Sequence, residues 1–313
     1  MTTILPQLNS DLGELADVVR KSLVQVAAGR RGTGSGVVFS ADGLVVTNAH
    51  VVSGRRSRGS DRAFQVTLPD GPVVPAKLLA KDDDLDVAVL KIEHRDGHLP
   101  DLHPIELGDS KSLRPGQWVM AMGHPWGVAG AAAGGIVIGS GPDLPEAPRA
   151  GKDWVAVDLA LRPGHSGGPL VDATGTVVGI NTAIIPFAQG IGFAVPAYTA
   201  TWVAAVLITR GEIRRPVLGI AASGVDLPLK LAEEFGQPRA VRVFQVGKGT
   251  PAEQAGIKEG ELLLSANGAP LSSIDDLQRV MVFSEDGTVR LETAADTRRR
   301  EVEVRPRAMA MAG

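Results

Sequence analysis

Short apolar runs of the β type, separated by glycine and proline turns, recur from residue 24 to residue 180 and limit the folds open to this chain. Many short strands joined by such turns are typical of a β-barrel or a β-sandwich. The runs lie at 24–27, 36–39, 44–47, 64–68, 87–92, 118–122 and 177–180. The sequence therefore predicts a mainly β domain in this region.

The length of 313 residues suits two domains, because one domain usually takes about 100–200 residues. Leucine and valine at spacings of mostly three and four predict an amphipathic helix within residues 1–25. Residues 210–216 combine charge, glycine and proline as linkers do. We therefore expect a main domain over 26–209 and a smaller α+β domain over 217–308.

The composition excludes several kinds of chemistry. A chain without cysteine has no disulfide, no thiol nucleophile and no cysteine-ligated zinc. A formal net charge of −3 gives no electrostatic reason to expect a nucleic-acid partner. His94, His98 and His103 lie in a polar stretch that offers no fixed ligand geometry. We expect an exposed loop there, with neither a metal nor a cofactor.

The first residues do not resemble a secretory signal, because Asp11, Glu14 and Asp17 interrupt a segment that is only weakly apolar. No apolar stretch approaches the roughly 18 residues expected of a membrane span. The chain as given therefore shows no signal peptide or transmembrane segment. The cytoplasm is the expected compartment, and export stays open if the chain is a trimmed form.

One serine lies among glycines, at Gly164-His165-Ser166-Gly167-Gly168, where the backbone can turn sharply and direct N–H groups to one point. The same residues fit the nucleophile elbow of α/β-hydrolases and the serine turn of chymotrypsin-type enzymes. Elbow enzymes place their acid and their histidine after the serine, but none of the six histidines follows Ser166. This excludes an elbow-type hydrolase with its own histidine and leaves the order His, Asp, Ser open.

A serine hydroxyl needs a base to take its proton and a carboxylate to orient that base. His50 ends an apolar strand and is a better candidate base than the histidines of the polar stretch. Asp86 opens the apolar run 87–90, where burial and orientation come easily, and is the first choice of carboxylate. Asp84 is the second choice, although the acidic run 82–84 is expected to be exposed.

Three motifs in this order resemble the catalytic motifs of the Deg/HtrA family, whose members are trypsin-like serine proteases with C-terminal PDZ domains. They are Thr-Asn-Ala-His-Val at 47–51, Asp-Val-Ala-Val-Leu-Lys at 86–91 and Gly-His-Ser-Gly-Gly-Pro-Leu at 164–170. Further matches lie at 34–38, 123–127, 179–183 and 190–196, in the order of the family. The resemblance extends over nearly the whole chain, and ordered motifs are far more specific than any single one.

The resemblance implies a mainly β chain, in which a chymotrypsin-like double β-barrel protease domain is followed by a small α+β PDZ domain. It makes Ser166 the nucleophile, His50 the general base and Asp86 the orienting carboxylate. The backbone N–H groups of Gly164 and Ser166 would form the oxyanion hole. This chemistry requires no metal and no cofactor.

Trypsin-like preference for Lys or Arg comes from an acid six residues before the serine, and Ala160 occupies that position here. Ala160 and Leu161 would instead line an apolar specificity pocket. The sequence therefore predicts cleavage after small or medium aliphatic residues.

Val217-Leu218-Gly219-Ile220 resembles the carboxylate-binding loop of Deg-type PDZ domains, and residues 249–257 and 262–268 continue the match. In this mode a peptide adds as an extra strand beside Ile220 while loop N–H groups hold its terminal carboxylate. The opposite wall of the groove would come from Leu277 and from Val280 or Met281 on the following helix. The expected ligands are peptide C-termini.

The chain departs from the family at several positions. His165 and His124 each stand where the family usually has asparagine, and the glycine-rich segment 127–139 is expected to be mobile. Family members commonly trimerise through aromatic residues near the N-terminus, but no aromatic residue precedes Phe39. Trimer formation is therefore in doubt, and the apolar face of the N-terminal helix either joins a homo-oligomer or packs on its own barrel.

The resemblance leads to an ATP-independent serine endopeptidase that degrades unfolded or damaged polypeptides, with a PDZ domain that binds peptide C-termini or exposed segments. The alternative is a peptide-binding chaperone or scaffold whose protease domain is weak or inactive because of His165 and the glycine-rich segment. A third hypothesis is a regulatory protease that cuts a single partner.

Overall fold

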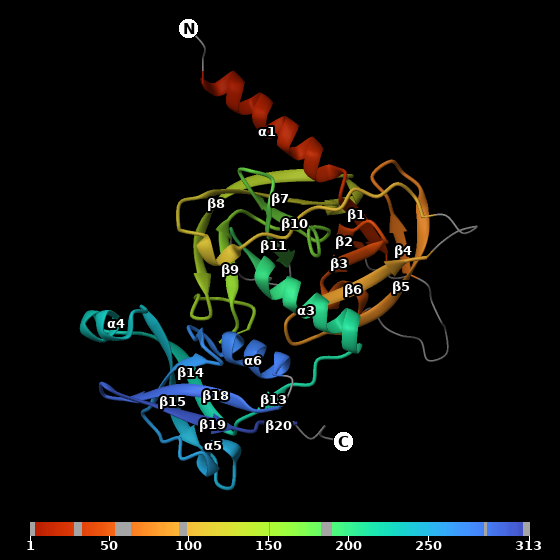
Figure 1. Ribbon diagram of the computed structural model, residues 1–313. Helices are drawn as coiled ribbons and strands as arrows, with labels where there is room; N and C mark the ends of the chain where they lie inside the picture. Colours follow the sequence, from red (N-terminus) through yellow and green to blue (C-terminus); the bar gives the residue numbers. More distant parts are fainter. Residues whose placement is uncertain are drawn as a thin grey trace. The chain divides into compact units, whose positions relative to one another are not determined.

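The computed structural model describes residues 4–27, 33–53, 64–93, 99–149, 151–182, 190–284 and 287–308. His94 and His98 lie outside these residues. The chain divides into two compact units, and each is described by itself (Figure 1). The first takes Met1–Ser140, Leu144–Pro148 and Trp154–Glu212, and the second takes Gly141–Asp143, Arg149–Asp153 and Ile213–Gly313.

The first unit contains a closed six-stranded barrel whose order is β1-β2-β3-β6-β5-β4. Valine dominates its buried core, as the alternation of apolar side chains along short strands predicts. Its strands are β1 (Leu23–Ala27), β2 (Thr33–Ser40), β3 (Leu44–Thr47), β4 (Phe64–Thr67), β5 (Val73–Asp82) and β6 (Val87–Ile92).

A second closed barrel follows with the order β10-β11-β12-β9-β8-β7. The glycine-rich segment expected to be mobile contributes most of β8, which pairs with β7 from Gly123 to Trp118. The strands are β7 (Trp118–Gly123), β8 (Ala131–Gly141), β9 (Trp154–Asp158), β10 (Pro169–Asp172), β11 (Val177–Thr182) and β12 (Ile191–Pro196). Two closed barrels make this unit a chymotrypsin-like double barrel.

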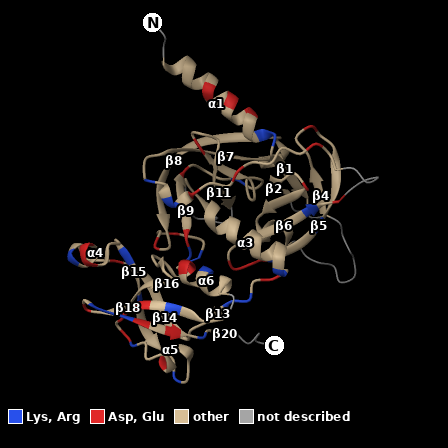
Figure 2. Ribbon diagram, in the orientation of Figure 1, with Lys and Arg blue, Asp and Glu red and all other residues tan. Residues whose placement is uncertain are grey.

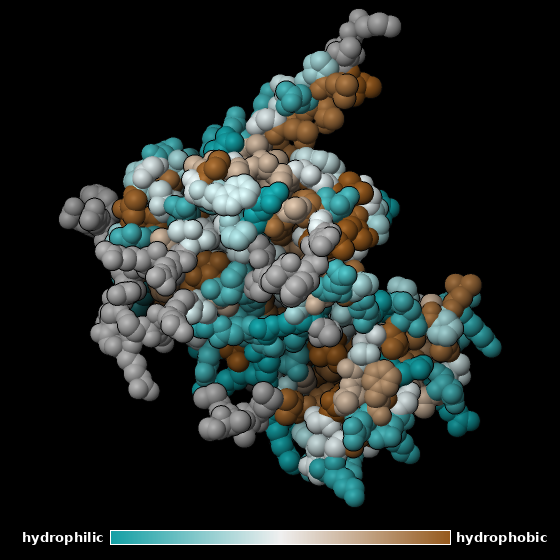
Figure 3. All heavy atoms as spheres, turned by 180° about the vertical axis from the view of Figure 1, so that it is seen from behind, coloured by the Kyte–Doolittle hydropathy of each residue, from teal (hydrophilic) through white to brown (hydrophobic). Residues whose placement is uncertain are grey.

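Few helices accompany the barrels. They are α1 (Ile4–Arg20), α2 (Ala49–Val52), α3 (Ala197–Arg210) and the 3₁₀ turns η1 (Ser110–Ser112) and η2 (Pro125–Gly127). Helix α1 is amphipathic, with Ala16 and Val19 buried near its C-terminal end. At the other end Ile4 is 82% exposed and Leu5 is 76% exposed, and Figure 3 shows hydrophobic residues gathered along one side of this helix.

The second unit holds a mainly antiparallel sheet in the order β14-β15-β16-β18-β19, which leaves β14 at one edge. Helix α6 carries an apolar face into the core of this unit, where Leu277 and Met281 are buried. The elements are β13 (Pro216–Val217), β14 (Ile220–Asp226), α4 (Leu229–Phe235), β15 (Arg239–Val246), α5 (Pro251–Gln254), β16 (Leu262–Ala266), β17 (Ala269–Pro270), α6 (Ile274–Phe283), β18 (Val289–Ala295), β19 (Arg298–Val304) and β20 (Arg307–Ala308).

Two local expectations need correction. Asp82 was expected to be exposed but is only 5% exposed, because its Oδ1 accepts hydrogen bonds from the backbone N–H groups of Asp84 and Leu85 and so closes the turn. His50 does not end a strand but lies in the single turn of α2 that follows β3. Both units carry Lys and Arg as well as Asp and Glu residues, in keeping with the small net charge (Figure 2).

Candidate active site

His50 and Asp86 come from neighbouring parts of the first barrel and form a close pair. His50 Nδ1 lies 3.0 Å from Asp86 Oδ1 and 2.9 Å from Oδ2, and the His50 backbone N–H donates to Oδ1 at 3.0 Å. The Asp86 side chain is 8% exposed, whereas that of His50 is 33% exposed. The carboxylate is therefore enclosed while one side of the imidazole remains accessible.

The backbone at Asp86 has φ +54°, a left-handed conformation that aspartate and asparagine tolerate better than most residues. The Asn48 side chain donates to the Asp86 carbonyl at 3.0 Å and holds this turn against the start of α2. Thr182 Oγ1, at the end of β11 in the second barrel, donates to Asp86 Oδ2 at 3.1 Å. The carboxylate is thus anchored from both barrels.

Ser166 is 6% exposed and lies in the turn that leads into β10. The Ser166 carbonyl accepts from the Ser35 N–H at 2.7 Å, so its backbone is fixed to the first barrel. A Cβ added to Gly34 would lie 2.7 Å from Val51 Cγ2 and 3.0 Å from the Ser166 carbonyl oxygen. The structure therefore brings the Ser166 backbone beside Val51, the residue that follows His50.

The turn before Ser166 requires glycine at Gly164, which has φ +106°. The His165 N–H donates to the Arg162 carbonyl at 2.9 Å, and proline followed by glycine at the two central positions is the sequence that a type II turn needs. Gly167 has φ +84°, and a Cβ there would overlap the Ser35 carbonyl oxygen and Thr47 Oγ1. Close backbone packing therefore shapes this half of the site.

Two buried histidines flank the turn. His124 Nδ1 lies 3.0 Å from Ser35 Oγ, and burial lowers the pKa of His124 to about 4. Burial also lowers the pKa of His165, against a hydrogen bond with the Arg162 backbone that raises it. The sequence analysis identified both histidines as departures from the family. It included Ser35 only as part of the family match at 34–38 and gave it no role.

An enclosed carboxylate beside an accessible imidazole can hold the ring with its proton on Nδ1 and leave Nε2 to act as a base. Acyl transfer also needs a nucleophile, and Ser166, in its glycine-shaped turn on the other barrel, is the residue predicted for that role. Asp84, the second-choice carboxylate, instead donates its N–H to Asp82. The structure therefore brings two of the three predicted residues, His50 and Asp86, into direct contact.

Comparison with known proteins identifies the family of the chain. Residues 34–180 match the family model of the trypsin-like peptidase domain, and residues 242–294 match that of the PDZ domain. The putative serine protease HhoB of Synechocystis sp. is 38% identical over 272 residues, which are 82% of this chain and 62% of the relative. The chain belongs to the Deg/HtrA family.

A probable periplasmic serine endoprotease DegP-like of Pseudomonas savastanoi pv. phaseolicola is 37% identical over 277 residues, or 87% of this chain and 55% of the relative. The chain thus spans about half to three-fifths of the curated Deg/HtrA relatives that it matches.

Solved structures agree with the sequence relatives. The HtrA-type protease AlgW with a tripeptide has a TM-score of 0.72 and 28% identity, over 95% of this chain and 97% of that one. The serine endoprotease from Yersinia pestis has a TM-score of 0.64 and 26% identity, over 95% of this chain and 98% of that one.

The two residues predicted to form the specificity pocket differ in burial. Ala160 is exposed, whereas Leu161 is half-buried and packs against the core of the second barrel. A Cβ on Gly192 would lie 3.0 Å from Leu161 Cγ, so Leu161 follows the backbone of β12 closely. Leu161 is therefore an apolar residue held on the second barrel, just before the turn that leads to Ser166 along the chain.

The predicted peptide-binding residues of the Deg/HtrA chain lie at the β14 edge of the second unit and on α6. Gly219 has φ +79° and precedes β14, and its carbonyl accepts from the Gly247 N–H at 2.9 Å. Leu218 and Leu277 are both 3% exposed and belong to the core, against which Ile220 and Val280 pack as half-buried residues. A strand at the edge of a sheet, with apolar residues beside it, is the kind of surface on which peptides add as strands.

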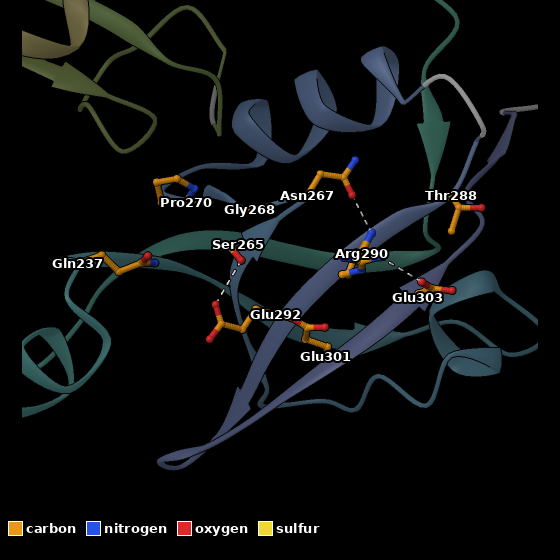
Figure 4. A pocket seen from close by; sticks show the side chains of 10 residues that line it. All are labelled: Gln237, Ser265, Asn267, Gly268, Pro270, Thr288, Arg290, Glu292, Glu301 and Glu303. Carbon is orange, nitrogen blue, oxygen red and sulfur yellow. Dashed lines mark hydrogen bonds and ion pairs between the residues drawn. The ribbon is translucent and has the colours of Figure 1, made fainter.

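A different hollow of about 730 Å³ lies in the same unit, and its lining is polar (Figure 4). Arg290 forms an ion pair of 3.7 Å with Glu303, and Ser265 Oγ donates to Glu292 at 3.2 Å, both drawn in Figure 4. The lining residues are Gln237, Ser265, Asn267, Gly268, Pro270, Thr288, Arg290, Glu292, Glu301 and Glu303. They share no member with the predicted peptide-binding residues.

Within the described ranges no three His, Asp or Glu side chains are grouped as a metal site would need. His103, the one described histidine of the polar stretch, is exposed. No helix in the described part of the chain is long and apolar enough to cross a membrane.

Proposed function

We propose that this chain is an ATP-independent serine endopeptidase that hydrolyses peptide bonds of unfolded or damaged polypeptides. The observation that supports this most strongly is the pair of contacts made by the Asp86 carboxylate. It lies 2.9 Å from His50 Nδ1 and accepts a hydrogen bond from Thr182 of the second barrel. Family membership supports the same activity. In this proposal residues 26–209 form the protease domain, residues 1–25 its N-terminal helix, 210–216 the linker and 217–308 the PDZ domain.

The proposed reaction starts when His50 Nε2 takes the proton of the Ser166 hydroxyl and the oxygen attacks the peptide carbonyl. Asp86 keeps the imidazole oriented and stabilises its positive charge. The N–H groups of Gly164 and Ser166 donate to the oxyanion of the tetrahedral intermediate. His50 then gives its proton to the leaving amine, and a water that it activates hydrolyses the acyl-enzyme.

The proposed specificity is for small or medium aliphatic residues before the cleaved bond, because Ala160 replaces the acid that would attract Lys or Arg. Leu161 supplies the apolar wall. Profiling of a peptide library checks this, and dominance of Lys or Arg at that position would contradict it.

The proposed role of the second unit is to bind peptide C-termini along β14, with the loop at Leu218 and Gly219 holding the carboxylate. We expect a peptide with a free C-terminal carboxylate to bind at least tenfold more tightly than the same peptide as its amide, because the amide loses the charge-assisted hydrogen bonds. Calorimetric titration measures both. Equal affinities would contradict carboxylate recognition at this loop.

The N-terminal helix of the chain offers a surface for assembly. We propose a homo-oligomer that uses the exposed apolar end of α1, where Ile4 and Leu5 lie, and light scattering of the full chain tests it.

The sequence favours the cytoplasm, whereas the DegP-like relative is named periplasmic. Fractionation of cells that express the natural chain distinguishes the two compartments.

The activity is tested by digesting an unfolded, casein-like protein with the intact chain and with Ser166→Ala. We expect many cleavage sites with the intact chain and none with the variant. A single site would favour a regulatory protease. Binding of the substrate without cleavage, even with PDZ-binding peptides added, would overturn the protease and favour the scaffold.

A further inference from the structure

A buried cluster of three groups, Ser35, His124 and the Gly164 carbonyl, lies directly behind the serine turn. Ser35 Oγ donates to the Gly164 carbonyl at 2.8 Å and lies 3.0 Å from His124 Nδ1. The backbone N–H of His124 approaches both Ser35 Oγ and the Gly164 carbonyl at 3.0 Å. Ser35 is 0% exposed and His124 is 8% exposed, so solvent does not compete for these hydrogen bonds.

The hydrogen-bonding capacity of the groups fixes the direction of this network. A carbonyl oxygen only accepts, so the single proton of the Ser35 hydroxyl is used on Gly164. The oxygen of Ser35 then accepts, and His124 Nδ1 must carry a proton to donate to it. Because burial lowers the pKa of His124 to about 4, the ring is neutral at pH 7 and has this proton only in its Nδ1–H tautomer.

The position of the network relates it to the proposed oxyanion hole. The clamped carbonyl belongs to Gly164, and its carbon is two bonds from the Gly164 nitrogen, whose N–H is proposed to bind the oxyanion. Glycine has no Cβ to restrict its conformation, so the turn depends on outside contacts to select φ +106°. Hydrogen bonds from Ser35 Oγ and from the His124 backbone N–H hold the Gly164 carbonyl. They restrict the peptide plane between residues 164 and 165, which adjoins the peptide group that carries the Gly164 N–H.

We propose that Ser35 and His124 are positioning residues for the oxyanion hole, acting as a relay in which His124 Nδ1–H donates to Ser35 and Ser35 donates to the Gly164 carbonyl. The proposal rests on the proposed protease activity and deepens it. Neither side chain needs to touch the substrate. Their effect is on the orientation of a backbone donor that contributes only when the oxyanion forms, and so on kcat rather than on KM.

Ser35→Ala is the first test. Loss of an oxyanion donor costs about 100- to 1000-fold in kcat, and loss of its support costs less, so we expect kcat to fall about 10- to 100-fold with KM changed less than about twofold. A peptide boronate, which places a tetrahedral oxygen in the hole, should lose affinity in parallel with kcat. Thr199→Val is the matched control, because it removes an equally buried hydroxyl from α3, and it should leave both values unchanged.

Substitutions of His124 test the relay itself. His124→Leu removes the donor at similar volume and should lower kcat about as much as Ser35→Ala, whereas His124→Asn keeps an N–H donor and should stay within about threefold of the intact chain. The double variant Ser35→Ala/His124→Leu should lose no more than either single variant, because the two groups act as one unit. Multiplied losses in the double variant would contradict the relay.

Nitrogen-15 NMR of histidine-labelled protein gives a readout that does not depend on activity. We expect a neutral Nδ1–H tautomer for His124 at pH 7, and an Nε2–H tautomer would overturn the relay. If the intact chain cleaves and Ser35→Ala stays within about threefold of it, the positioning role is wrong. If the intact chain neither cleaves nor binds the boronate, the proposed activity fails instead, and the tautomer alone decides the relay.

Discussion

The two barrels hold their halves of the candidate active site by different means. In the first barrel, the His50 ring and its backbone N–H contact the Asp86 carboxylate. Asn48 of the same barrel donates to the Asp86 carbonyl, and Thr182 of the second barrel donates to the Asp86 carboxylate. In the second barrel, the serine turn is shaped by backbone packing so close that glycines have no room for a Cβ at 164, 167 and 168.

This difference predicts how each half responds to substitution. Removal of a hydrogen bond in the first half should lower the rate while the fold survives, because the partners lose orientation and not space. Addition of an atom in the second half should damage the fold and the rate together, because the backbone itself must move.

The largest effect is expected from Asp86→Asn. Asparagine tolerates φ +54° and fills the same space, but it no longer stabilises the His50 imidazolium and no longer enforces the tautomer with the proton on Nδ1. We expect kcat to fall about 10⁴-fold with the melting temperature almost unchanged. Steady-state kinetics and calorimetry measure both, and a loss below about tenfold would contradict the assignment of Asp86.

Gly167→Ala should lower stability and kcat together, whereas Asp86→Asn lowers kcat alone. Its new Cβ would overlap the Ser35 carbonyl oxygen, so we expect the free energy of unfolding to fall by about 3 kcal/mol and kcat by about 100-fold. Gly116→Ala is the matched control, since Gly116 has φ +89° but a Cβ added there would meet no atom within 4 Å. It should show only the backbone strain of about 1 kcal/mol, with normal activity. Equal losses in both variants would show that packing does not shape the turn.

Thr182→Val tests the link between the two halves. It removes the 3.1 Å hydrogen bond to Asp86 at nearly constant volume, and the other contacts of the carboxylate remain. We expect kcat to fall about tenfold, because one hydrogen bond to a charged group contributes about 1.5 kcal/mol or more. An unchanged kcat would mean that the first barrel alone positions Asp86.

The smallest effect concerns pH and His124. Its pKa is about 4 in the folded protein against 6.5 for the free side chain, so the unfolded chain binds the extra proton between these values. The lowered pKa of His124 therefore costs no stability above pH 6.5. As the pH falls from 6.5 to 4, the free energy of unfolding decreases by about 3 kcal/mol because only the unfolded chain binds the proton. Denaturant unfolding at several pH values should show a shallower decline for His124→Asn, with the remaining decline due in part to His165. Identical pH profiles would contradict this origin.

Much of the first half of the site could be predicted from the sequence. His50 and Asp86 each adjoin a strongly apolar strand, and the lack of any histidine after Ser166 excludes an elbow-type hydrolase with its own histidine. The short strands between glycine turns predict a barrel or a sandwich, and it is the family resemblance that implies the double barrel. Local patterns suffice for the strands because the alternating apolar residues and the turn residues lie close together in the sequence.

The features that the sequence did not predict depend on residues far apart. Ser35 reaches His124 and Gly164, which are 89 and 129 positions away, so no local pattern reveals its role. The glycine-rich segment was expected to be mobile, but it forms β8 because Gly134 lets the Trp118 ring pack closely and Gly135 lies against the Asp158 carbonyl. Glycine marks close approach here and not flexibility.

The most direct test of the central claim is covalent labelling of the intact chain with a serine-directed phosphonate, followed by peptide mapping. The account predicts one equivalent of label on Ser166, no label on Ser166→Ala, and labelling of Asp86→Asn that is slowed in proportion to its kcat. An intact, folded chain that takes no label, or a label that persists in Ser166→Ala, would contradict the assignment of Ser166 as the nucleophile.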